Sequence, residues 1–437
     1  MQKVNLPRNE FKLTRNSLNS FLNLYDSSII TCFIADKQSL TDEMLNTLIA
    51  STPKLRMLSL RGCRCLTDLS VMEISKLLNL KCLRLASCPS VTDVSIIHLS
   101  KNLPCIEYLE VNGCVDLTDK SLEAICRGWN KLKHFKCAAL SKITDSGILN
   151  LSTNLSDLNL FQMSFSFQRI VGLKTLHFRN LHCLSLITIP ESSEDFLISV
   201  LKNNANLKSL SLVYCTISGK FLLESYDFSL DFLSVIGCNN FGSHFYNIFT
   251  DHFPIFELSV TINSHCGYDV SFPGIKKLSA RFSSTSTLNL SENLERYKFL
   301  KSDSLVSLTI WHKNISIGQN CLEFVINNCR NLQYLSIDRV LISNSKILSF
   351  NANRSIRNLF GRYFMSLDFE FIYKLSRALP SLESAAFSHS YNLTAEMIDI
   401  LCENCSLLKS VGIFGCKKIS DLEKMQLRED NNIELLD

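Results

Sequence analysis

A short segment recurs along this 437-residue chain at intervals of 25 or 26 residues. Four well-formed copies begin at Leu55, Leu80, Ile106 and Leu132, and each has apolar residues at its positions 1, 4 and 6. A Thr-Asp pair follows each copy, and apolar residues at helical spacing follow the pair. A unit of this size cannot bury its own apolar face, so neighbouring units must stack. The repeat therefore predicts one elongated array in place of the two or three globular domains that the length alone suggests.

The same opening recurs twelve more times, which makes sixteen units in all. These further openings begin at Ile29, Leu155, Leu173, Leu207, Leu230, Ile255, Ile275, Leu305, Leu332, Ile356, Leu382 and Leu408. The units between residues 151 and 381 are irregular, because residues 155–172 and 275–294 leave little room for a helix. Within the same region, residues 192–207 read as a capped helix.

Each unit combines a short strand with a following helix. Apolar residues at positions 4 and 6 predict a strand with one buried face. The threonine is a good helix N-cap, and the aspartate after it places negative charge at the positive end of the helix dipole. Stacked units of this kind predict an α/β fold, a solenoid or horseshoe with a concave parallel sheet inside and convex helices outside.

The 26-residue unit, with cysteine at position 9 and a following Thr-Asp pair, resembles the cysteine-containing leucine-rich repeat of the F-box/leucine-rich-repeat family. Residues 29–150 and 382–421 carry the resemblance well, and residues 151–381 carry only its strand core. The resemblance implies a leucine-rich-repeat solenoid over residues 29–437 that binds a substrate on its concave face. In that family an N-terminal F-box docks onto a cullin-RING ubiquitin ligase.

The N-terminal residues 1–28 are shorter than the F-box of the family, and a different alignment fits them better. Three of them lie 27 residues before Thr41, Leu45 and Leu48 of the first helix, namely Thr14, Leu18 and Phe21. We therefore expect an N-terminal half-repeat that caps the sheet, with a degenerate F-box as the alternative. The resemblance then implies a family member without an F-box, or a substrate-binding chain that reaches the ligase by another route.

The cysteines at position 9 predict a ladder and not a metal site. They are Cys63, Cys88, Cys114, Cys215, Cys238 and Cys416. A metal needs thiolates that converge to roughly 2.3 Å from one ion, whereas these lie one repeat apart. We expect them to be small buried packing residues, with Cys329 and Cys405 in a second buried column and Cys65 in an exposed turn. The motif Cys402-Glu-Asn-Cys405 has no second pair or nearby histidine pair to make a zinc site.

Composition and motifs argue against several classes of function. Lys+Arg 45 nearly balance Asp+Glu 41 without a basic block, so we expect no nucleic-acid partner. The N-terminus lacks a signal-peptide core, and no apolar run approaches the roughly 18 residues of a membrane span. No catalytic or phosphate-binding motif occurs, so we expect neither an enzyme nor a cofactor or metal site. The chain is expected in the cytoplasm, and also in the nucleus, with reduced thiols.

The concave face is the expected binding surface, because side chains at positions 3, 5 and 7 point away from the core. Aromatic and arginine side chains are enriched at interface hot spots. The candidate partner-binding residues on this basis are Arg61, Arg84, Tyr108, Glu110, His134, Lys136, His177, Arg179, Trp311, Tyr334, Asp338 and Arg362. The second tryptophan, Trp129, falls in a helix-to-strand turn and is expected to pack inside.

These features predict a protein-protein interaction module. The resemblance implies the substrate-recognition subunit or adaptor of an SCF-type cullin-RING ubiquitin ligase, with its target on the concave face. Two alternatives stay open: a ligase-independent scaffold or regulator of a signalling protein, and a receptor for a small polar ligand.

Overall fold

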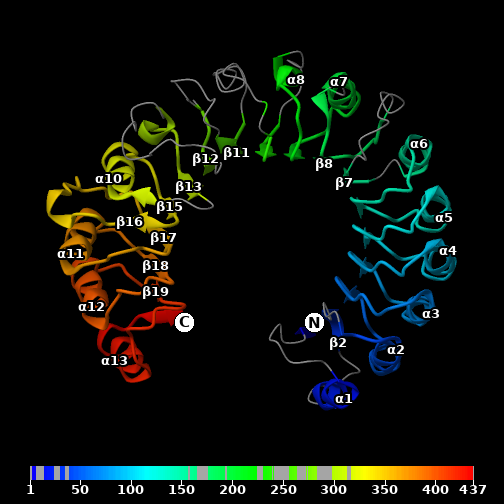
Figure 1. Ribbon diagram of the computed structural model, residues 1–437, viewed down its shortest axis with the longest axis horizontal. Coiled ribbons are helices and arrows are strands. Elements are labelled where there is room, and N and C mark those ends of the chain that lie inside the picture. Colours follow the sequence, from blue (N-terminus) through cyan, green and yellow to red (C-terminus); the bar gives the residue numbers. More distant parts are fainter. Residues whose placement is uncertain are drawn as a thin grey trace. The chain divides into compact units, whose positions relative to one another are not determined.

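The computed structural model describes residues 2–5, 14–23, 30–34, 39–155, 158–164, 176–191, 194–223, 230–238, 240, 255–262, 272, 274–282, 298–312 and 316–436. These residues belong to two compact units, Met1–Phe228 and Ser229–Asp437. In each unit the helices cover one face of a parallel sheet and leave the other face, here called the open face, uncovered (Figure 1). The expected boundary at residue 28 remains a prediction.

The first unit contains parallel strands that pair in chain order. They are β1 (Gln2–Asn5), β2 (Ile30–Ile34), β3 (Met57–Ser59), β4 (Cys82–Arg84), β5 (Tyr108–Glu110), β6 (His134–Cys137), β7 (Leu160–Ser164), β8 (Cys183–Ile187) and β9 (Ser209–Val213). The helices are α1 (Arg15–Asn23), α2 (Asp42–Ser51), α3 (Asp68–Glu73), η2 (Ile74–Lys76), α4 (Asp93–Asn102), α5 (Asp119–Gly128), α6 (Asp145–Asn154), α7 (Glu194–Asn203) and α8 (Lys220–Leu223). At the N-terminal end β1 pairs with β2, and α1 contacts α2.

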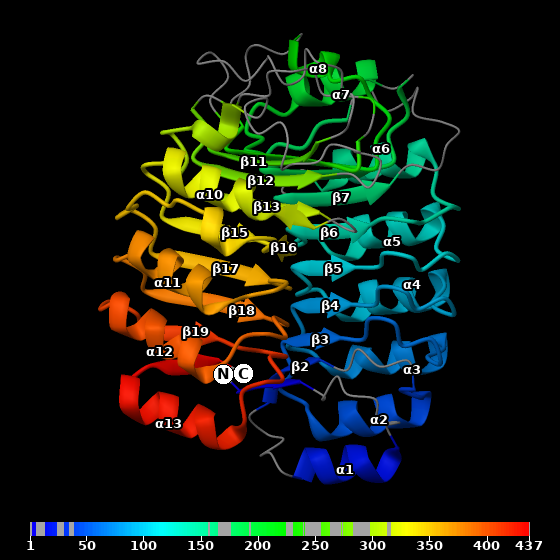
Figure 2. The ribbon, with the colours of Figure 1, turned by 60° about the vertical axis from the view of Figure 1, so that its left-hand side comes forward.

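The second unit repeats this plan, and its parallel strands again follow chain order (Figure 2). They are β10 (Phe232–Ile236), β11 (Glu257–Ile262), β12 (Lys277–Phe282), β13 (Ser307–His312), β15 (Tyr334–Ile337), β17 (Asn358–Arg362), β18 (Ser384–Ser388), β19 (Ser410–Gly412) and β20 (Glu434–Leu436). β14 (Ile317–Gly318) pairs with β16 (Val340–Leu341) in a separate small sheet. The helices are η6 (Lys298–Lys301), α10 (Gln319–Asn328), η7 (Ser345–Ile347), α11 (Phe369–Ala378), α12 (Ala395–Asn404) and α13 (Asp421–Asn431).

The strand register follows the sequence repeat. Leu58 pairs with Leu83, which pairs with Leu109, and all three occupy position 4 of their repeats. These leucines are fully buried under the helices. The expected α/β leucine-rich-repeat solenoid is therefore confirmed. The helix expected within residues 192–207 is also confirmed, as α7.

Three of the predicted repeat openings are wrong. Phe33, and not Cys32, pairs with Leu58 and is buried, so the first opening is Ile30 and not Ile29. A shift of one residue exchanges the buried and exposed faces of a strand, and the burial of Phe33 shows that the register opening at Ile30 is the correct one. Phe161 pairs with Phe135 at position 4, which moves the opening from Leu155 to Leu158.

The third error concerns the opening at Leu173. Residues 176–178 are not in a strand, and β8 belongs to a repeat that opens at Leu181. Leu184 of β8 pairs with Leu210 of β9 and occupies position 4 of that repeat. The sequence also predicts that residues 155–172 and 275–294 leave little room for a helix. Most of these residues lie outside the described part of the chain.

The Thr-Asp pairs connect neighbouring repeats. Thr118 donates to the carboxylate of Asp93, one repeat earlier, through its backbone N–H (2.9 Å) and its hydroxyl (2.6 Å). Ser121 adds a short hydroxyl hydrogen bond to the same carboxylate. The aspartates of α2, α3 and α5 accept from the next threonine in the same way. Each aspartate therefore joins its own helix to the following repeat.

The expected threonine caps are confirmed in part. The side chains of Thr41, Thr92 and Thr118 accept a hydrogen bond from the first turn of their helices. Thr67 and Thr144 make no such bond, although their hydroxyls still donate to the preceding aspartate. Trp129 is fully buried at the end of α5, as expected.

The position-9 cysteines form the expected buried ladder. Cys114 donates from Sγ to the carbonyl oxygen of Leu85 in the preceding repeat, at 3.0 Å, and Cys416 makes the equivalent bond to Phe387. Burial raises the pKa of the Cys114 thiol to about 12. Cys329 and Cys405 are likewise buried, whereas Cys65 is exposed. The ladder therefore packs and hydrogen-bonds between repeats, and the raised pKa keeps the Cys114 thiol protonated at neutral pH.

Candidate interaction surface

The open face carries the side chains from positions 3, 5 and 7. Tyr108, Arg84 and His134 are half-buried there, as expected for a surface that faces solvent. Glu110 and Ser59 occupy equivalent positions, but they are buried among the neighbouring side chains. Rows of side chains on adjacent parallel strands lie close enough to cover one another. A position on the open face therefore does not by itself make a residue accessible.

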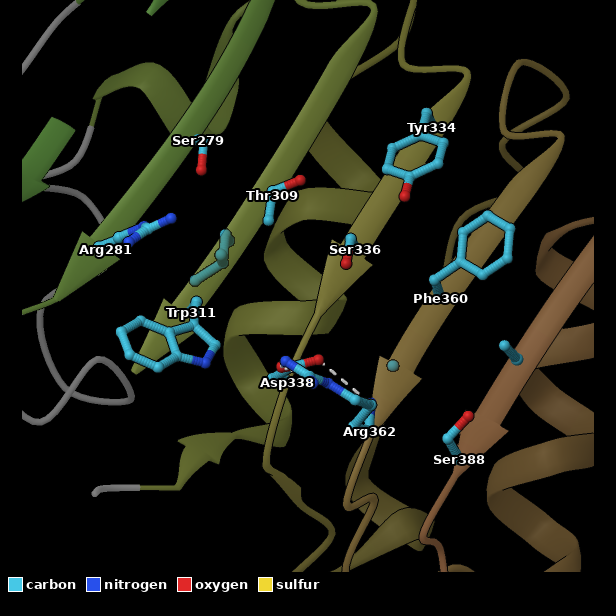
Figure 3. A pocket seen from close by; sticks show the side chains of 13 residues that line it. Ser279, Arg281, Thr309, Trp311, Tyr334, Ser336, Asp338, Phe360, Arg362 and Ser388 are labelled. Carbon is cyan, nitrogen blue, oxygen red and sulfur yellow. Dashed lines mark hydrogen bonds and ion pairs between the residues drawn. The ribbon is translucent and has the colours of Figure 1, made fainter. Parts of the chain in front are cut away.

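A pocket of about 540 Å³ lies on the open face of the second unit (Figure 3). It spans the strands from β12 to β18, and four of the predicted binding residues line it together. The lining residues are Ser279, Arg281, Thr309, Ile310, Trp311, Tyr334, Ser336, Asp338, Phe360, Gly361, Arg362, Ala386 and Ser388. This volume is typical of a site that holds one or a few side chains of a partner, or a small ligand.

One ion pair fixes the polar end of this pocket. Nε and Nη2 of Arg362 donate to the same carboxylate oxygen of Asp338, at 3.0 Å and 2.6 Å. The backbone N–H of Arg362 also donates to Asp338, at 3.2 Å. These hydrogen bonds and the charge of the carboxylate raise the pKa of Arg362. Asp338 is buried while Arg362 is 57% exposed, so the pair holds the guanidinium in place with one edge toward solvent.

Aromatic side chains line the pocket on two sides (Figure 3). The guanidinium carbon of Arg281 lies 5.7 Å from the ring centre of Trp311, within the range of a cation–π contact. Tyr334 and Phe360 form a second pair, with their ring centres 5.2 Å apart. Small side chains between them, among them Ser336, keep the floor open. The pocket thus combines apolar walls with positive charge, which suits an apolar side chain next to an acidic group.

The first unit carries a second group of predicted residues around the carboxylate of Glu110. Arg61, two repeats away, donates to this carboxylate through Nε at 3.2 Å and more closely through Nη2. The Nε of Arg84 lies 3.8 Å from the same oxygen, and its guanidinium carbon lies 4.9 Å from the ring centre of Tyr108. Among the described residues, this buried Nε has no hydrogen-bond partner. The carboxylate of Glu110 therefore balances part of the positive charge of both Arg61 and Arg84.

The neighbouring column continues onto β6. His134 contacts Tyr108 with ring centres 5.9 Å apart, and Lys136 follows on the same face of β6. Burial raises the pKa of the Tyr108 hydroxyl. Burial and then the charges of Lys133 and Lys136 lower the pKa of His134. The lowered pKa favours the neutral form of the imidazole that contacts Tyr108.

His177 and Arg179 do not lie where the sequence placed them. Both are exposed, and neither belongs to a strand. Nδ1 of His177 lies 2.5 Å from the carbonyl oxygen of Asn203, at the end of α7. The error follows from the wrong opening at Leu173, whose apolar spacing resembles that of the true opening at Leu181.

The structure adds residues that the sequence analysis did not select. Arg281 occupies position 7 of the repeat that opens at Ile275, and Phe360 occupies position 5 of the repeat at Ile356. The rule that selected Trp311 and Tyr334 would also have selected both. Among the described residues, no group of His, Cys, Asp or Glu could hold a metal ion. No described helix has the length and apolar character to span a membrane.

Comparison with known proteins identifies no family for this chain. No family model matches the chain, and no curated protein matches it. One similar solved structure is described as the crystal structure of the Rad7 and Elc1 complex in yeast. The TM-score is 0.37 and the sequence identity 16%, over 97% of this chain and 83% of that chain. The class of the protein, a leucine-rich-repeat solenoid, is defined by the strand register and repeats of this chain itself.

Proposed function

We propose that this chain is a protein-interaction module that binds its partner on the open face of the sheet. The observation that carries the proposal is the pocket between Trp311, Tyr334 and Arg362, where aromatic and arginine side chains from successive repeats converge. Such side chains dominate the binding energy of protein interfaces, above all where they line a pocket. The proposal involves no catalytic step, and it places the chain in the cytoplasm or nucleus.

The geometry supports a partner segment with an apolar side chain next to a carboxylate. The apolar side chain would enter between Trp311 and Tyr334, and the carboxylate would bind the free edges of Arg281 and Arg362. The carboxylate of Asp338 already accepts from Arg362, so the guanidinium is oriented before a partner arrives. Preorganisation of this kind reduces the entropy lost on binding.

The finer proposal is that the chain recruits its partner to a cullin-RING ubiquitin ligase. Its support is the resemblance of the repeats to those of the F-box family, and fold alone does not carry function. Purification of the tagged chain should then recover a cullin and its adaptor, and deletion of residues 1–28 should abolish that recovery. Because β1 and α1 lie in this segment, the melting temperature of the deletion variant must be measured alongside. Recovery of a partner without any cullin would favour the scaffold alternative.

Binding through the pocket is tested with a matched pair of variants. Trp311→Ala removes an aromatic wall of the pocket, and Phe369→Ala removes an exposed aromatic side chain from α11 on the helix side. We expect Trp311→Ala to lower the affinity of the chain for its purified partner about 30-fold, the usual effect of losing a hot-spot tryptophan. Phe369→Ala should leave the affinity unchanged. Equal affinities for both variants would contradict the proposal.

The volume of the pocket also keeps the small-ligand receptor as a second candidate. About 540 Å³ lies within the range of small-molecule sites. A metabolite that raises the melting temperature of the wild-type chain, but not that of Trp311→Ala, would favour this candidate over a protein partner.

A further inference from the structure

The residue at position 8 of most described repeats adopts a left-handed backbone conformation. These residues are Gly62, Ser87, Gly113, Ala139, Thr188, Tyr214, Gly237, Arg339, Tyr363, His389 and Gly415. In most of these repeats the backbone N–H of this residue donates to a carbonyl of the next repeat, for example from Gly62 to Ala86 and from Tyr363 to Ser388, both at 2.8 Å. The N–H of Gly237 donates instead to the hydroxyl of Thr261, also at 2.8 Å. The backbone role is the same for Gly62 and Tyr363, so glycine is sufficient for the fold at this position.

Three successive repeats of the second unit place large side chains at this position. Arg339, Tyr363 and His389 have φ angles of 59°, 61° and 56°. A left-handed conformation costs an L-residue roughly 1–2 kcal/mol, and glycine avoids most of this cost. Ser87, Ala139, Thr188 and Tyr214 adopt the same conformation in other repeats, so the strain by itself does not distinguish these three residues. Arg339, Tyr363 and His389 differ in that three large polar side chains follow one another in successive repeats with no glycine between them.

The three side chains form a continuous column, here called the position-8 column. The guanidinium carbon of Arg339 lies 5.3 Å from the ring centre of Tyr363. The rings of Tyr363 and His389 stack with their centres 5.0 Å apart and an angle of 13°. The column ends over Gly415, where an added Cβ would lie only 2.4 Å from Nδ1 of His389. Glycine at this repeat leaves the space that the imidazole fills.

A hollow of about 430 Å³ adjoins the column. It is lined by Ser316, Arg339, Tyr363, Phe364, Met365, Ser366, His389, Tyr391 and Asn392. Tyr391 is 56% exposed, and Phe414, whose ring meets that of His389 at 5.2 Å and 89°, is 60% exposed. Large aromatic side chains this exposed, next to a hollow, indicate a surface that a partner covers.

The charges at this edge favour an acidic partner. The faces of the Tyr363 and His389 rings are stacked on each other, so the rings offer mainly their edges, which carry partial positive charge. Arg339 adds a full positive charge, and Lys417 and Lys418 occupy the positions one repeat after Tyr391 and Asn392. Among the described residues that line the hollow, none is acidic. Stacking of nucleic-acid bases would need free ring faces, which the column lacks.

We propose that the position-8 column is a second docking site, distinct from the open-face pocket, and that it binds an acidic peptide segment of a partner protein. Carboxylates of the segment pair with Arg339 and with the ring edges, and an apolar or aromatic side chain beside them covers Tyr391 and Phe414.

The test uses random dodecapeptides displayed on phage and selected on the full-length chain. Selected peptides, synthesised with a fluorescent label, are measured against wild type, Tyr363→Gly/His389→Gly and Trp311→Ala. Because glycine relieves the backbone strain, the double variant should keep the melting temperature of the wild type within a few degrees. Arg339→Gln, which removes one charge without altering the backbone requirement, serves as a second variant if the double variant is unstable.

We expect peptides that carry glutamate or aspartate beside an aromatic or aliphatic residue. Their affinity should fall at least about tenfold in the double variant and measurably in Arg339→Gln, and it should stay unchanged in Trp311→Ala. Peptides without acidic residues, or acidic peptides that bind wild type and both column variants equally, would overturn the proposal. Loss of binding in Trp311→Ala alone would assign the peptides to the open-face pocket and would equally overturn it.

Discussion

Replacing Asp93 with alanine is expected to lower the free energy of unfolding by about 2–3 kcal/mol. The carboxylate accepts two hydrogen bonds from Thr118 and one from Ser121, all from the following repeat. A hydrogen bond to a charged group contributes roughly 1.5–3 kcal/mol, and the three share one partly exposed acceptor, so their contributions do not add fully. Asp93→Asn keeps an acceptor oxygen and should cost only about 1 kcal/mol.

The effect of Asp93→Asn should depend on pH in a defined direction. Burial raises the pKa of Asp93, but the hydrogen bonds from Ser121 and Thr118 outweigh it and leave the pKa below its usual value. A carboxylate whose pKa is lowered by folding stabilises the protein above its unfolded-state pKa, about 3.9. This stabilisation is lost as the pH falls through the folded-state pKa. The difference between wild type and Asp93→Asn should therefore be constant at neutral pH and shrink below about pH 4.

Urea unfolding at several pH values, followed by circular dichroism, measures this difference. Asp195→Ala is the matched control for Asp93→Ala, because Asp195 lies in the first turn of α7 and is exposed. It also lies in the first turn of its helix, but among the described residues its carboxylate accepts no hydrogen bond from a following threonine. Its replacement should therefore cost at most about 0.5 kcal/mol. Equal losses for Asp93→Ala and Asp195→Ala would refute the idea that the aspartates join neighbouring repeats.

Three further predictions concern Glu110, the cysteine ladder and the packing of α4 against α5. Glu110→Ala leaves Arg61 and Arg84 without their shared carboxylate and should cost about 3 kcal/mol in urea unfolding; a loss under 1 kcal/mol would contradict the burial of this charge. Exposed Cys65 should react with iodoacetamide at pH 8 much faster than Cys114, whose pKa is raised to about 12. Mass spectrometry of timed samples measures both rates, and equal rates would contradict the burial of the cysteine ladder. Gly128→Ala places a Cβ 2.1 Å from the backbone oxygen of Ser100 and should cost at least about 2 kcal/mol, whereas an unchanged melting temperature would show that α4 and α5 can separate easily.

The sequence was sufficient to predict the fold class because the repeat appears many times. Each copy provides the same alternation, and errors in single copies do not alter the pattern. The errors that occurred arise where two apolar spacings compete, as at Ile29 and Ile30, or at Leu173 and Leu181. Burial of Phe33 and pairing of Leu184 decide these cases, and both depend on neighbouring strands.

Contacts between repeats were not predictable from the same reasoning. Asp93 and Thr118 are 25 residues apart, and Arg61 and Glu110 are 49 residues apart. A single sequence shows the aspartate as a first-turn residue of its own helix, and only the stacked structure shows the donor of the next repeat. The left-handed column was hidden for a related reason, because Arg339, Tyr363 and His389 do not look like turn residues.

The candidate residues of the second unit came together because their repeats were read in the correct register. Trp311, Tyr334, Asp338 and Arg362 lie at positions 3 or 7 of three successive repeats and line one pocket. Whether this pocket binds a protein remains a prediction of the geometry.

Hydroxyl-radical footprinting of the chain with its purified partner tests this central claim most directly. Trp311 and Tyr334 report on the open-face pocket, and Phe369 and Tyr373, 46% and 45% exposed on α11, report on the helix side. We predict that the partner protects Trp311 and Tyr334 from oxidation and leaves Phe369 and Tyr373 unchanged. Protection of Phe369 and Tyr373, with Trp311 oxidised as fast as in the free chain, would contradict it.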